Sequence, residues 1–365
     1  MGDEVQMARA LALAERGRGL CSPNPMVGAV LVRAGAVVGE GWHEGPGNPH
    51  AEVVALREAG ERALGATLFT TLEPCGHFGR TPPCTGIIID AGVARAVSAI
   101  RDPNPVVDGR GFERLAAAGI KTEWGPLRGE AERQIGAYLK HVRTGLPLVT
   151  MKMAASLDGK VAARDGTSRW ITGEEARADV HRLRAASDAI VVGAGTALAD
   201  DPSLTVRDPE YRGAPVLRVL VDARGRVPAT GDLFDESAPT LVATTERSAE
   251  ERRKEWHAAG AEVVSYGSDA DLVPLERLFA DLGKRDLQAV LLEGGPTLAW
   301  TAVRDGLVDR LVVYLAPILI GGRGAPGILE GEGFASVAAA GKVEITRFDR
   351  IGRDLKVEAD VHRDR

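Results

Sequence analysis

Apolar residues recur at helical spacing at the start of the chain and gather in β-branched runs in the segment that follows. Residues 3–16 carry apolar side chains at helical spacing behind an acidic start, which predicts an amphipathic helix. Residues 26–33 and 37–42 are apolar runs on either side of Ala34-Gly35. This pattern predicts a β-hairpin packed beside the first helix.

Helices and strands alternate from Pro49 onward. Pro49 can occupy the first position of a helix, so we expect a helix from there to about Ala59. Pro74-Cys75 is expected to open a further helical turn. Further strands are expected at residues 68–73, 93–100 and 120–123, and further helices at residues 84–91 and 111–118. A helix, a hairpin and then alternating elements predict an α/β sandwich that ends near Trp124.

Turn-forming residues mark a boundary near the middle of the chain. Residues 130–142 have apolar side chains on one face, which predicts a helix that links two domains. Thr144-Gly145-Leu146-Pro147 follows it and has the composition of a turn. We therefore expect one domain at residues 1–145 and a second at residues 146–365.

The second half alternates apolar strands with amphipathic helices, which predicts a largely parallel sheet covered on both faces. Strands are expected at residues 148–155, 189–192, 216–222, 240–244, 289–293 and 311–315, and helices at residues 174–186, 249–259, 274–282 and 297–305. A hairpin of residues 342–348 and 354–361 is expected to close the sheet.

Composition narrows the class of protein. A length of 365 residues suits two domains, and 44% hydrophobic with 26% charged residues is typical of a globular protein. The net charge of −6 argues against a nucleic-acid surface, which needs clustered cations. No apolar run approaches the roughly 18 residues of a membrane span, and the N-terminus is acidic rather than basic. We expect a cytoplasmic protein with neither a membrane nor a nucleic-acid partner.

Residues with zinc-binding chemistry lie in the first half. His50-Ala51-Glu52 precedes Pro74-Cys75 and Cys84. One imidazole and two thiolates can hold Zn²⁺ and leave a fourth position for water, with Glu52 as acid and base beside the metal. The eight residues between the cysteines include His77, which could replace Cys84 or, by joining all three ligands, make the site structural. We favour the open site, with residues 76–83 as a loop that contacts the substrate.

Two glycine-rich turns follow apolar strands in the second half. They are Val192-Gly193-Ala194-Gly195-Thr196 and Leu292-Glu293-Gly294-Gly295-Pro296-Thr297. Backbone N–H groups at such turns can bind anions, but neither turn matches the G-x-G-x-x-G dinucleotide pattern, and such a turn is more often only a tight connection. Lys152 lies midway along an apolar strand, where a lysine needs a partner or a task.

Several runs resemble one family of enzymes. In the first half they are Ser22-Pro23-Asn24-Pro25-Met26-Val27-Gly28-Ala29-Val30, Gly41-Trp42-His43, His50-Ala51-Glu52, Glu73-Pro74-Cys75-Gly76-His77-Phe78-Gly79-Arg80-Thr81-Pro82-Pro83-Cys84 and Asp102-Pro103-Asn104-Pro105. In the second half they are Met151-Lys152-Met153-Ala154-Ala155-Ser156-Leu157-Asp158-Gly159-Lys160, Ser168-Arg169-Trp170-Ile171-Thr172-Gly173, Asp200-Asp201-Pro202-Ser203-Leu204-Thr205-Val206-Arg207 and Glu293-Gly294-Gly295-Pro296-Thr297. They resemble the bifunctional riboflavin-biosynthesis deaminase/reductase family, RibD (RibG). The resemblance implies a cytidine-deaminase-like α/β sandwich followed by an α/β domain similar to dihydrofolate reductase, with Zn²⁺ and NADPH as cofactors.

The resemblance also implies roles for individual residues. Zinc ligands are His50, Cys75 and Cys84, and catalytic candidates are Glu52, Lys152 and Asp200. Cofactor contacts fall on Ala154, Trp170, Thr196, Asp200, Gly295, Pro296, Thr297, Leu298, Ala299, Trp300 and Thr301. Substrate contacts fall on Asn24, His43, His77, Arg80, Ser168, Arg184, Leu204, Arg207 and Glu293. Arg184 and Arg207 are expected to grip a phosphate, and Ala223 stands where many relatives have Ser.

The implied function is deamination of a pyrimidine ribosyl phosphate, followed by reduction of its ribosyl group to ribityl. A homo-oligomer formed through the reductase domain is also possible for such a chain. Two rival hypotheses are a deaminase of nucleic-acid bases, which needs a basic groove, and a non-catalytic protein with a structural zinc. The acidic net charge disfavours the first, and the presence of Glu52 and both glycine-rich turns disfavours the second.

Overall fold

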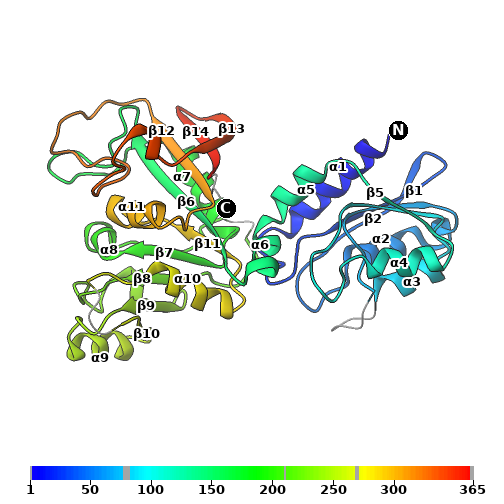
Figure 1. Ribbon diagram of the computed structural model, residues 1–365, viewed down its shortest axis with the longest axis horizontal. Coiled ribbons are helices and arrows are strands. Elements are labelled where there is room, and N and C mark those ends of the chain that lie inside the picture. Colours follow the sequence, from blue (N-terminus) through cyan, green and yellow to red (C-terminus); the bar gives the residue numbers. More distant parts are fainter. Residues whose placement is uncertain (1, 77–82, 209–210, 268–270, 362–365) are drawn as a thin grey trace. The chain divides into compact units, whose positions relative to one another are not determined.

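The computed structural model describes residues 2–76, 83–208, 211–267 and 271–361. The chain divides into two compact units, Met1–Gly145 and Leu146–Arg365, each built on its own sheet (Figure 1). Over the described ranges, every helix is too short or too polar to cross a membrane.

The first unit is a five-stranded sheet with helices on both faces (Figure 1). The strands lie in the order β2-β1-β3-β4-β5, where β1 is antiparallel to β2 and β3, and β3, β4 and β5 are parallel. Their bounds are Gly28–Arg33 for β1, Ala36–Trp42 for β2, Thr67–Leu72 for β3, Arg95–Ile100 for β4 and Lys121–Trp124 for β5.

Alternation along the strands produces two cores in this unit. In β1, Ala29 and Leu31 face one core, whereas Val30 faces the other, because successive side chains of a strand point to opposite faces. Helices α2 (Ala51–Ala59), α3 (Cys84–Asp90) and α4 (Arg110–Ala117) cover the first core. Helices α1 (Asp3–Ala14), α5 (Arg128–Gln134) and α6 (Gly136–Thr144) cover the second. The predicted α/β sandwich is confirmed.

Three local predictions in this unit were wrong. The expected linking helix is two helices, α5 and α6, which meet at Ile135 and pack with their buried residues in the second core. Helix α2 begins after His50, which is its N-cap, so Pro49 lies outside the helix. Cys75 follows β3 in irregular backbone, and of the two cysteines only Cys84 begins a helix.

Helix α2 lies unusually close to strand β2, because β2 has glycines where the two elements cross. A Cβ atom on Gly41 would lie 2.3 Å from the carbonyl oxygen of Ala51, and one on Gly39 would lie 2.2 Å from that of Ala55. Real Cβ atoms do not approach backbone so closely, so only glycine permits this packing. The start of α2, which carries His50 and Glu52, is therefore positioned by backbone contact.

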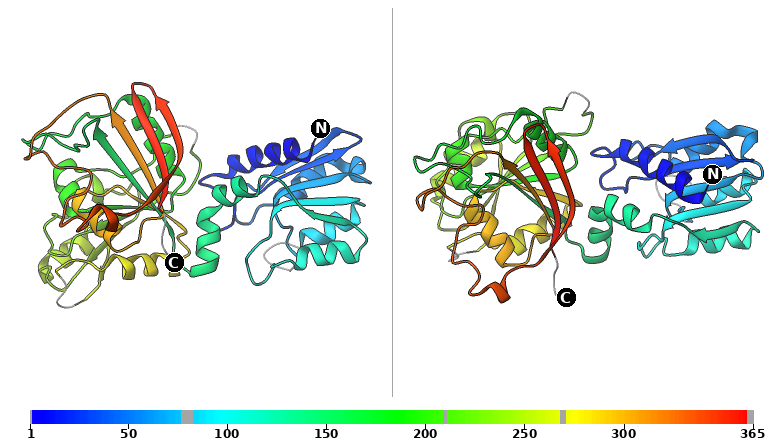
Figure 2. Two further views of the ribbon diagram at one scale, coloured as in Figure 1. Left: turned by 45° about the horizontal axis from the view of Figure 1, so that its top comes forward. Right: turned by 90° about the horizontal axis from the view of Figure 1, so that it is seen from above.

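The second unit contains a nine-stranded sheet in the order β10-β9-β8-β7-β11-β6-β12-β14-β13. The seven strands from β10 to β12 are parallel, and the closing hairpin β13–β14 adds two antiparallel strands at one edge (Figure 2). The strands are β6 (Leu148–Ser156), β7 (Ala189–Gly193), β8 (Leu217–Val221), β9 (Thr240–Thr244), β10 (Glu262–Ser265), β11 (Ala289–Leu292), β12 (Arg310–Ala316), β13 (Val343–Ile351) and β14 (Asp354–Val361).

Cores on both faces of this sheet confirm the predicted double coverage. On β7, Val191 packs in one core while Ile190 and Val192 pack in the other. The α-helices are α7 (Glu174–Ala185), α8 (Ala194–Asp200), α9 (Glu250–Ala258), α10 (Leu275–Lys284) and α11 (Pro296–Arg304). Among the strands and α-helices described in this unit, β10 and α8 were not predicted; β10 is a short edge strand, and α8 begins directly at the glycine-rich end of β7.

Replacing Gly41 by Ala should destabilise the first unit. The new methyl group would have to push α2 off the sheet, and overpacking of this kind typically costs about 1–3 kcal/mol. Urea unfolding measures the change. The matched control is Gly129→Ala in α5, where a Cβ meets nothing within 4 Å and stability should stay equal or rise. Equal stability of Gly41→Ala and wild type would contradict the close approach of α2.

Candidate active sites

Three side chains with metal-binding atoms converge in the first unit. His50 Nδ1, Cys75 Sγ and Cys84 Sγ all lie within 4.8 Å of one another. His50 Nδ1 lies 3.0 Å from Cys84 Sγ and 3.6 Å from Cys75 Sγ. The residues come from the N-cap of α2, the segment after β3 and the first position of α3. One nitrogen and two sulfurs in this arrangement suit Zn²⁺.

The site favours a thiolate even in the absence of a metal. A hydrogen bond from the Cys84 thiol, with help from His50, lowers the pKa of Cys75 to about 4 and raises the pKa of Cys84. The backbone N–H of Cys84 donates to Cys75 Sγ at 3.3 Å. The pKa of His50 is raised because it hydrogen-bonds to Cys75. A cation that binds here would therefore meet negative charge on sulfur.

Glu52 is the second residue of α2, two positions after His50, and is only 3% exposed. Burial raises the pKa of its carboxyl group to about 7. A group with a pKa near neutrality can both accept and release a proton, which is the property of a general acid and base. The structure thus places a buried carboxyl group with a near-neutral pKa beside the imidazole and the two thiols.

Glu73 supports the Cys75 segment, a role that the sequence did not suggest. Its buried carboxylate accepts the backbone N–H groups of Asp102, Gly109, Gly111 and Phe112, at 3.0 to 3.3 Å. These bonds tie the end of β3 to the loop between β4 and α4 and to the first turn of α4. A Cβ on Gly111 would lie 1.9 Å from the carbonyl oxygen of Pro74, so this packing also requires glycine.

The structure places two of the predicted substrate residues next to His50. The His43 ring is buried and lies edge-on to the His50 ring, with 5.4 Å between centroids. His43 Nε2 lies 3.0 Å from Asn24 Nδ2, and its Nδ1 lies 3.2 Å from the carbonyl oxygen of Pro49. Burial lowers the pKa of His43, so the ring is neutral: Nδ1–H donates to Pro49 and Nε2 accepts from Asn24. His77 and Arg80 lie outside the described residues.

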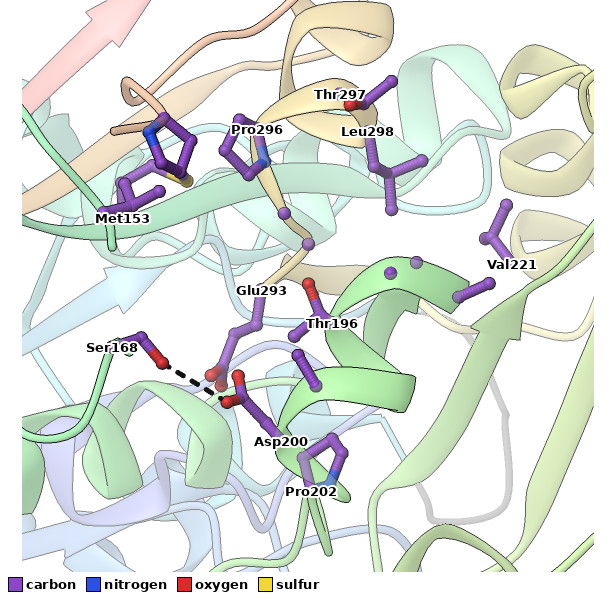
Figure 3. A pocket seen from close by; sticks show the side chains of 18 of the residues that line it. Met153, Ser168, Thr196, Asp200, Pro202, Val221, Glu293, Pro296, Thr297 and Leu298 are labelled. Atoms are coloured by element: carbon purple, nitrogen blue, oxygen red, sulfur yellow. Dashed lines mark hydrogen bonds between the residues drawn. The ribbon is translucent and has the colours of Figure 1, made fainter. Parts of the chain in front are cut away.

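A cavity of about 840 Å³ opens in the second unit at the carboxyl ends of the central parallel strands (Figure 3). Ligands of open α/β sheets bind at this edge. Most of the predicted residues line the cavity: Lys152, Ala154, Ser168, Trp170, Arg184, Thr196, Asp200, Leu204, Glu293, Gly295, Pro296, Thr297, Leu298 and Thr301. Figure 3 shows Ser168 hydrogen-bonded to Asp200, with Oγ and Oδ1 3.5 Å apart.

Three predicted residues do not line the cavity. Helix α11 turns Ala299 and Trp300 away: Ala299 is fully buried in the core, and the Trp300 ring packs on Phe334. The run 295–301 was assigned as a block, whereas a helix presents only one face to a ligand. Arg207 is exposed and donates from Nη2 to Ser203 Oγ at 2.5 Å.

Largely buried side chains of opposite charge meet in the lining of the cavity. Arg184 donates from Nε and Nη2 to the two carboxylate oxygens of Glu293, at 2.6 and 2.9 Å. Lys152 Nζ lies 3.9 Å from the same carboxylate. Glu293 takes the two donors that a bidentate grip on a phosphate would use, so the expected contact of Arg184 with a phosphate requires a change of partner and stays a prediction.

The pKa values of Glu293 and Lys152 are both lowered, and the neighbouring Arg184 contributes to both shifts. Burial alone would raise the pKa of Glu293, but the charges and hydrogen bonds of Arg184, with Lys152 behind them, lower it to about 2. The pKa of Lys152 is lowered, mainly by burial and also by Arg184, although Glu293 partly offsets this. Lys152 is thus a buried amine that releases a proton more readily than an exposed lysine.

Some residues that line the cavity were missed in the sequence. Arg177 lies over the ring of Trp170 at 4.6 Å from its centroid, and Trp170 itself is 66% exposed. Arg224 and Arg226 follow β8 and line the cavity as well. The available signal was a pair of basic residues directly after a predicted parallel strand, where ligands are expected to bind.

Comparison with known proteins gives a family model for each half of the chain. Residues 1–100 match the model of the cytidine and deoxycytidylate deaminase zinc-binding region, and residues 147–357 match that of the RibD C-terminal domain. The riboflavin biosynthesis protein RibD of Escherichia coli K12 is 43% identical, with 97% of this chain and 98% of that protein aligned. The RibD of Bacillus amyloliquefaciens is also 43% identical, with 98% and 96% aligned.

Solved structures agree over nearly the whole chain. One form of Acinetobacter baumannii RibD superposes with a TM-score of 0.87 at 37% identity, covering 99% of each chain. A Thermotoga maritima protein titled as a diaminohydroxyphosphoribosylaminopyrimidine deaminase/5-amino-6-(5-phosphoribosylamino)uracil reductase gives 0.86 at 33% identity, again covering 99% of each. The chain therefore belongs to the RibD family of bifunctional riboflavin-biosynthesis enzymes, which join a zinc-dependent deaminase to an NADPH-dependent reductase.

Proposed function

We propose that residues 1–145 are the deaminase domain, in which His50, Cys75 and Cys84 hold one Zn²⁺. The observation that carries this proposal is the convergence of three ligand atoms within 4.8 Å, next to the buried Glu52. Their donor set fits the metal, because one thiolate is already favoured at Cys75. When bound, the metal would act as a Lewis acid that makes water nucleophilic at neutral pH.

Glu52 would carry the proton in this domain. Its pKa near 7 lets it take a proton from the attacking water and pass it to the nitrogen that leaves as ammonia. The Asn24–His43 pair would contact the substrate beside His50, and His77 and Arg80 remain proposed contacts from the adjoining loop. The substrate would be 2,5-diamino-6-ribosylamino-4(3H)-pyrimidinone 5′-phosphate, in keeping with the name of the Thermotoga relative.

Residues 146–365 would form the reductase domain, with NADPH in the large cavity. The residues fit a dinucleotide: α11 begins at Pro296 after the N-cap Gly295, and because no side chain that the structure describes caps this end of the helix, its N-terminus is open to a phosphate. A Cβ on Gly295 would lie 2.9 Å from Thr196 Oγ1, so the turns after β7 and β11 lie close together. NADPH would supply the hydride.

The chain's own groups would hold the sugar and supply the proton. Asp200 and Ser168 lie together at one side of the cavity, where they can bind sugar hydroxyls (Figure 3). Lys152, with its lowered pKa, would give a proton to the ribosyl group as it is reduced to ribityl, and Arg184 would hold Glu293 beside it. Arg207, which lies outside the cavity, could reach a phosphate only if its side chain moved. The product would be 5-amino-6-ribitylamino-uracil 5′-phosphate.

We also propose that the protein forms a homo-oligomer through the reductase domain and acts in the cytoplasm. Edge strand β13 exposes Val343, Ile345 and Phe348 at 46%, 64% and 61%, and an apolar edge of this kind favours pairing with another chain. All three cysteines are free, which suits a reducing compartment.

Cys75→Ser and Cys84→Ser should each lose zinc and deaminase activity but keep reductase activity, because each removes one of three ligands. Mass spectrometry measures the zinc content, ammonia release measures deaminase activity, and NADPH oxidation measures reductase activity. Cys21→Ser, at a buried thiol outside the cluster, is the matched control and should keep its zinc. Full zinc content in Cys84→Ser would instead make His77 the third ligand.

Glu52→Gln should keep zinc and lose deamination. A general acid and base typically contributes about 10²–10⁴-fold in rate, and glutamine cannot carry the proton. Ammonia release reports the loss, while NADPH oxidation with a supplied intermediate should not change. Deamination within a few-fold of wild type would exclude Glu52 as the proton carrier.

Glu293→Gln should destabilise the second unit by about 3–5 kcal/mol, because it leaves Arg184 and Lys152 buried without their counter-charge. The matched control is Glu262→Gln, which breaks a similar bidentate pair with Arg285 at the surface and should cost about 0–1 kcal/mol. Denaturant unfolding compares the two. If the two variants lost equal stability, the buried triad would not be an electrostatic unit.

A further inference from the structure

The loop after β8 presents two arginines to the cavity, whereas its one acidic residue is buried. Arg224 and Arg226 both line the cavity and are both exposed. Asp222, between β8 and Arg224, is 1% exposed and also borders the cavity. Its carboxylate accepts the backbone N–H groups of Arg224 and Val227, at 3.3 and 2.7 Å. The carboxylate is thus engaged by the loop itself.

This arrangement matters for the ribose of a dinucleotide. In doubly wound sheets, an acidic residue that follows a strand binds the 2′-hydroxyl of the adenosine ribose in NAD, whereas arginine accommodates the 2′-phosphate of NADP. Because the Asp222 carboxylate is almost fully buried and accepts a loop N–H group on each oxygen, the side chains that this loop presents to a ligand are the cationic Arg224 and Arg226. The chemistry at this end of the cavity therefore suits a phosphate monoester better than a diol.

The local charge balance supports an anion site. Asp271 pairs with Arg224 at 3.3 Å and also with Arg247, so one carboxylate is shared between two guanidinium groups. These side chains are 46–66% exposed, and their pairs are correspondingly weak. Arg226 makes no hydrogen bond or ion pair with any residue that the structure describes. The loop therefore carries cationic charge that the protein does not balance locally.

The loop also lies at the appropriate distance from the reactive end. Strands β11 and β7 separate β6, which carries Lys152, from β8. Three strand spacings of about 4.8 Å correspond to roughly 14 Å, which an extended dinucleotide can span. Figure 3 shows Val221, the last residue of β8, on the opposite side of the cavity from Ser168, with the start of α11 between them.

We propose that Arg224 and Arg226 bind the 2′-phosphate on the adenosine ribose and so determine the preference of the reductase for NADPH over NADH. The proposal rests on the assignment of the cavity as the dinucleotide site. Asp271 weakens the site, because its carboxylate competes with the phosphate for Arg224. The two arginines are specificity residues and take no part in hydride transfer.

The test is binding to the full-length protein without substrate, measured by calorimetry with NADP⁺, NAD⁺, 2′-AMP and 5′-AMP. Arg226→Ala and Arg224→Ala should each weaken NADP⁺ and 2′-AMP by roughly 10- to 150-fold, the loss of one charge-assisted contact. NAD⁺ and 5′-AMP should change by less than about twofold. Arg226→Lys should recover part of the affinity, because it restores the charge without the planar fork.

Two further variants sharpen the test. Asp271→Asn should tighten NADP⁺ by a few-fold and leave NAD⁺ unchanged, because it removes the competing carboxylate. Arg304→Ala, at a surface arginine that pairs with Asp305 and does not line the cavity, removes one positive charge elsewhere and should change neither ligand. An equal loss in this control would mean that net charge, rather than these two side chains, attracts the phosphate, and would overturn the proposal.

The remaining outcomes separate the two levels of inference. If wild type prefers NADP⁺ and both arginine variants keep that preference, the specificity proposal is overturned while the reductase site stands. If wild type binds NADP⁺ and NAD⁺ equally, the specificity proposal also falls. If it binds neither dinucleotide, the cavity is not the cofactor site, and the proposed reductase function falls with it.

Discussion

Removing carboxylates from water is the constraint on which both sites depend, because a buried negative charge needs compensation or must take up a proton. Glu73 is compensated by four backbone N–H groups, and Glu293 by Arg184 and Lys152. Glu52 lacks compensation of that strength, and its pKa rises toward 7. The first two residues shape their surroundings, and the third is left free to exchange a proton.

The two units position the residues of their sites in different ways. In the first unit, close contact of backbone with backbone at Gly41 and Gly111, together with the hydrogen bonds of the Glu73 carboxylate, positions the segments that carry His50 and Cys75. In the second, the cavity arises where parallel strands end and turns diverge to either face of the sheet. A metal site needs three atoms held within a few ångströms, whereas a dinucleotide needs a long surface, and each architecture suits its ligand.

Short-range patterns predicted the elements well, and they failed where the outcome depends on tertiary contacts. The strands of both sheets, apart from the short edge strand β10, and the residues His50, Cys75 and Cys84 could be found from apolar runs and motif spacing. The helix α8 could not, because Gly193-Ala194-Gly195 has the composition of a turn, and packing against β7 and β8 makes a helix of it. The pairing of Arg184 with Glu293 joins positions 109 residues apart, and no local signal reports such a pair.

The helices α5 and α6 follow the last strand of the first sheet, yet they complete its second core through Ala131, Ile135 and Leu139. Tyr138, on α6, also donates its hydroxyl hydrogen to the buried Asp102, at 2.9 Å, in the loop that Glu73 organises. A fragment cut at Trp124, where the alternation of strand and helix ends, would expose that core and leave Asp102 without this donor. Anyone dissecting or recombining such enzymes would have to place the junction after Thr144, so the exchangeable module is longer than its sheet.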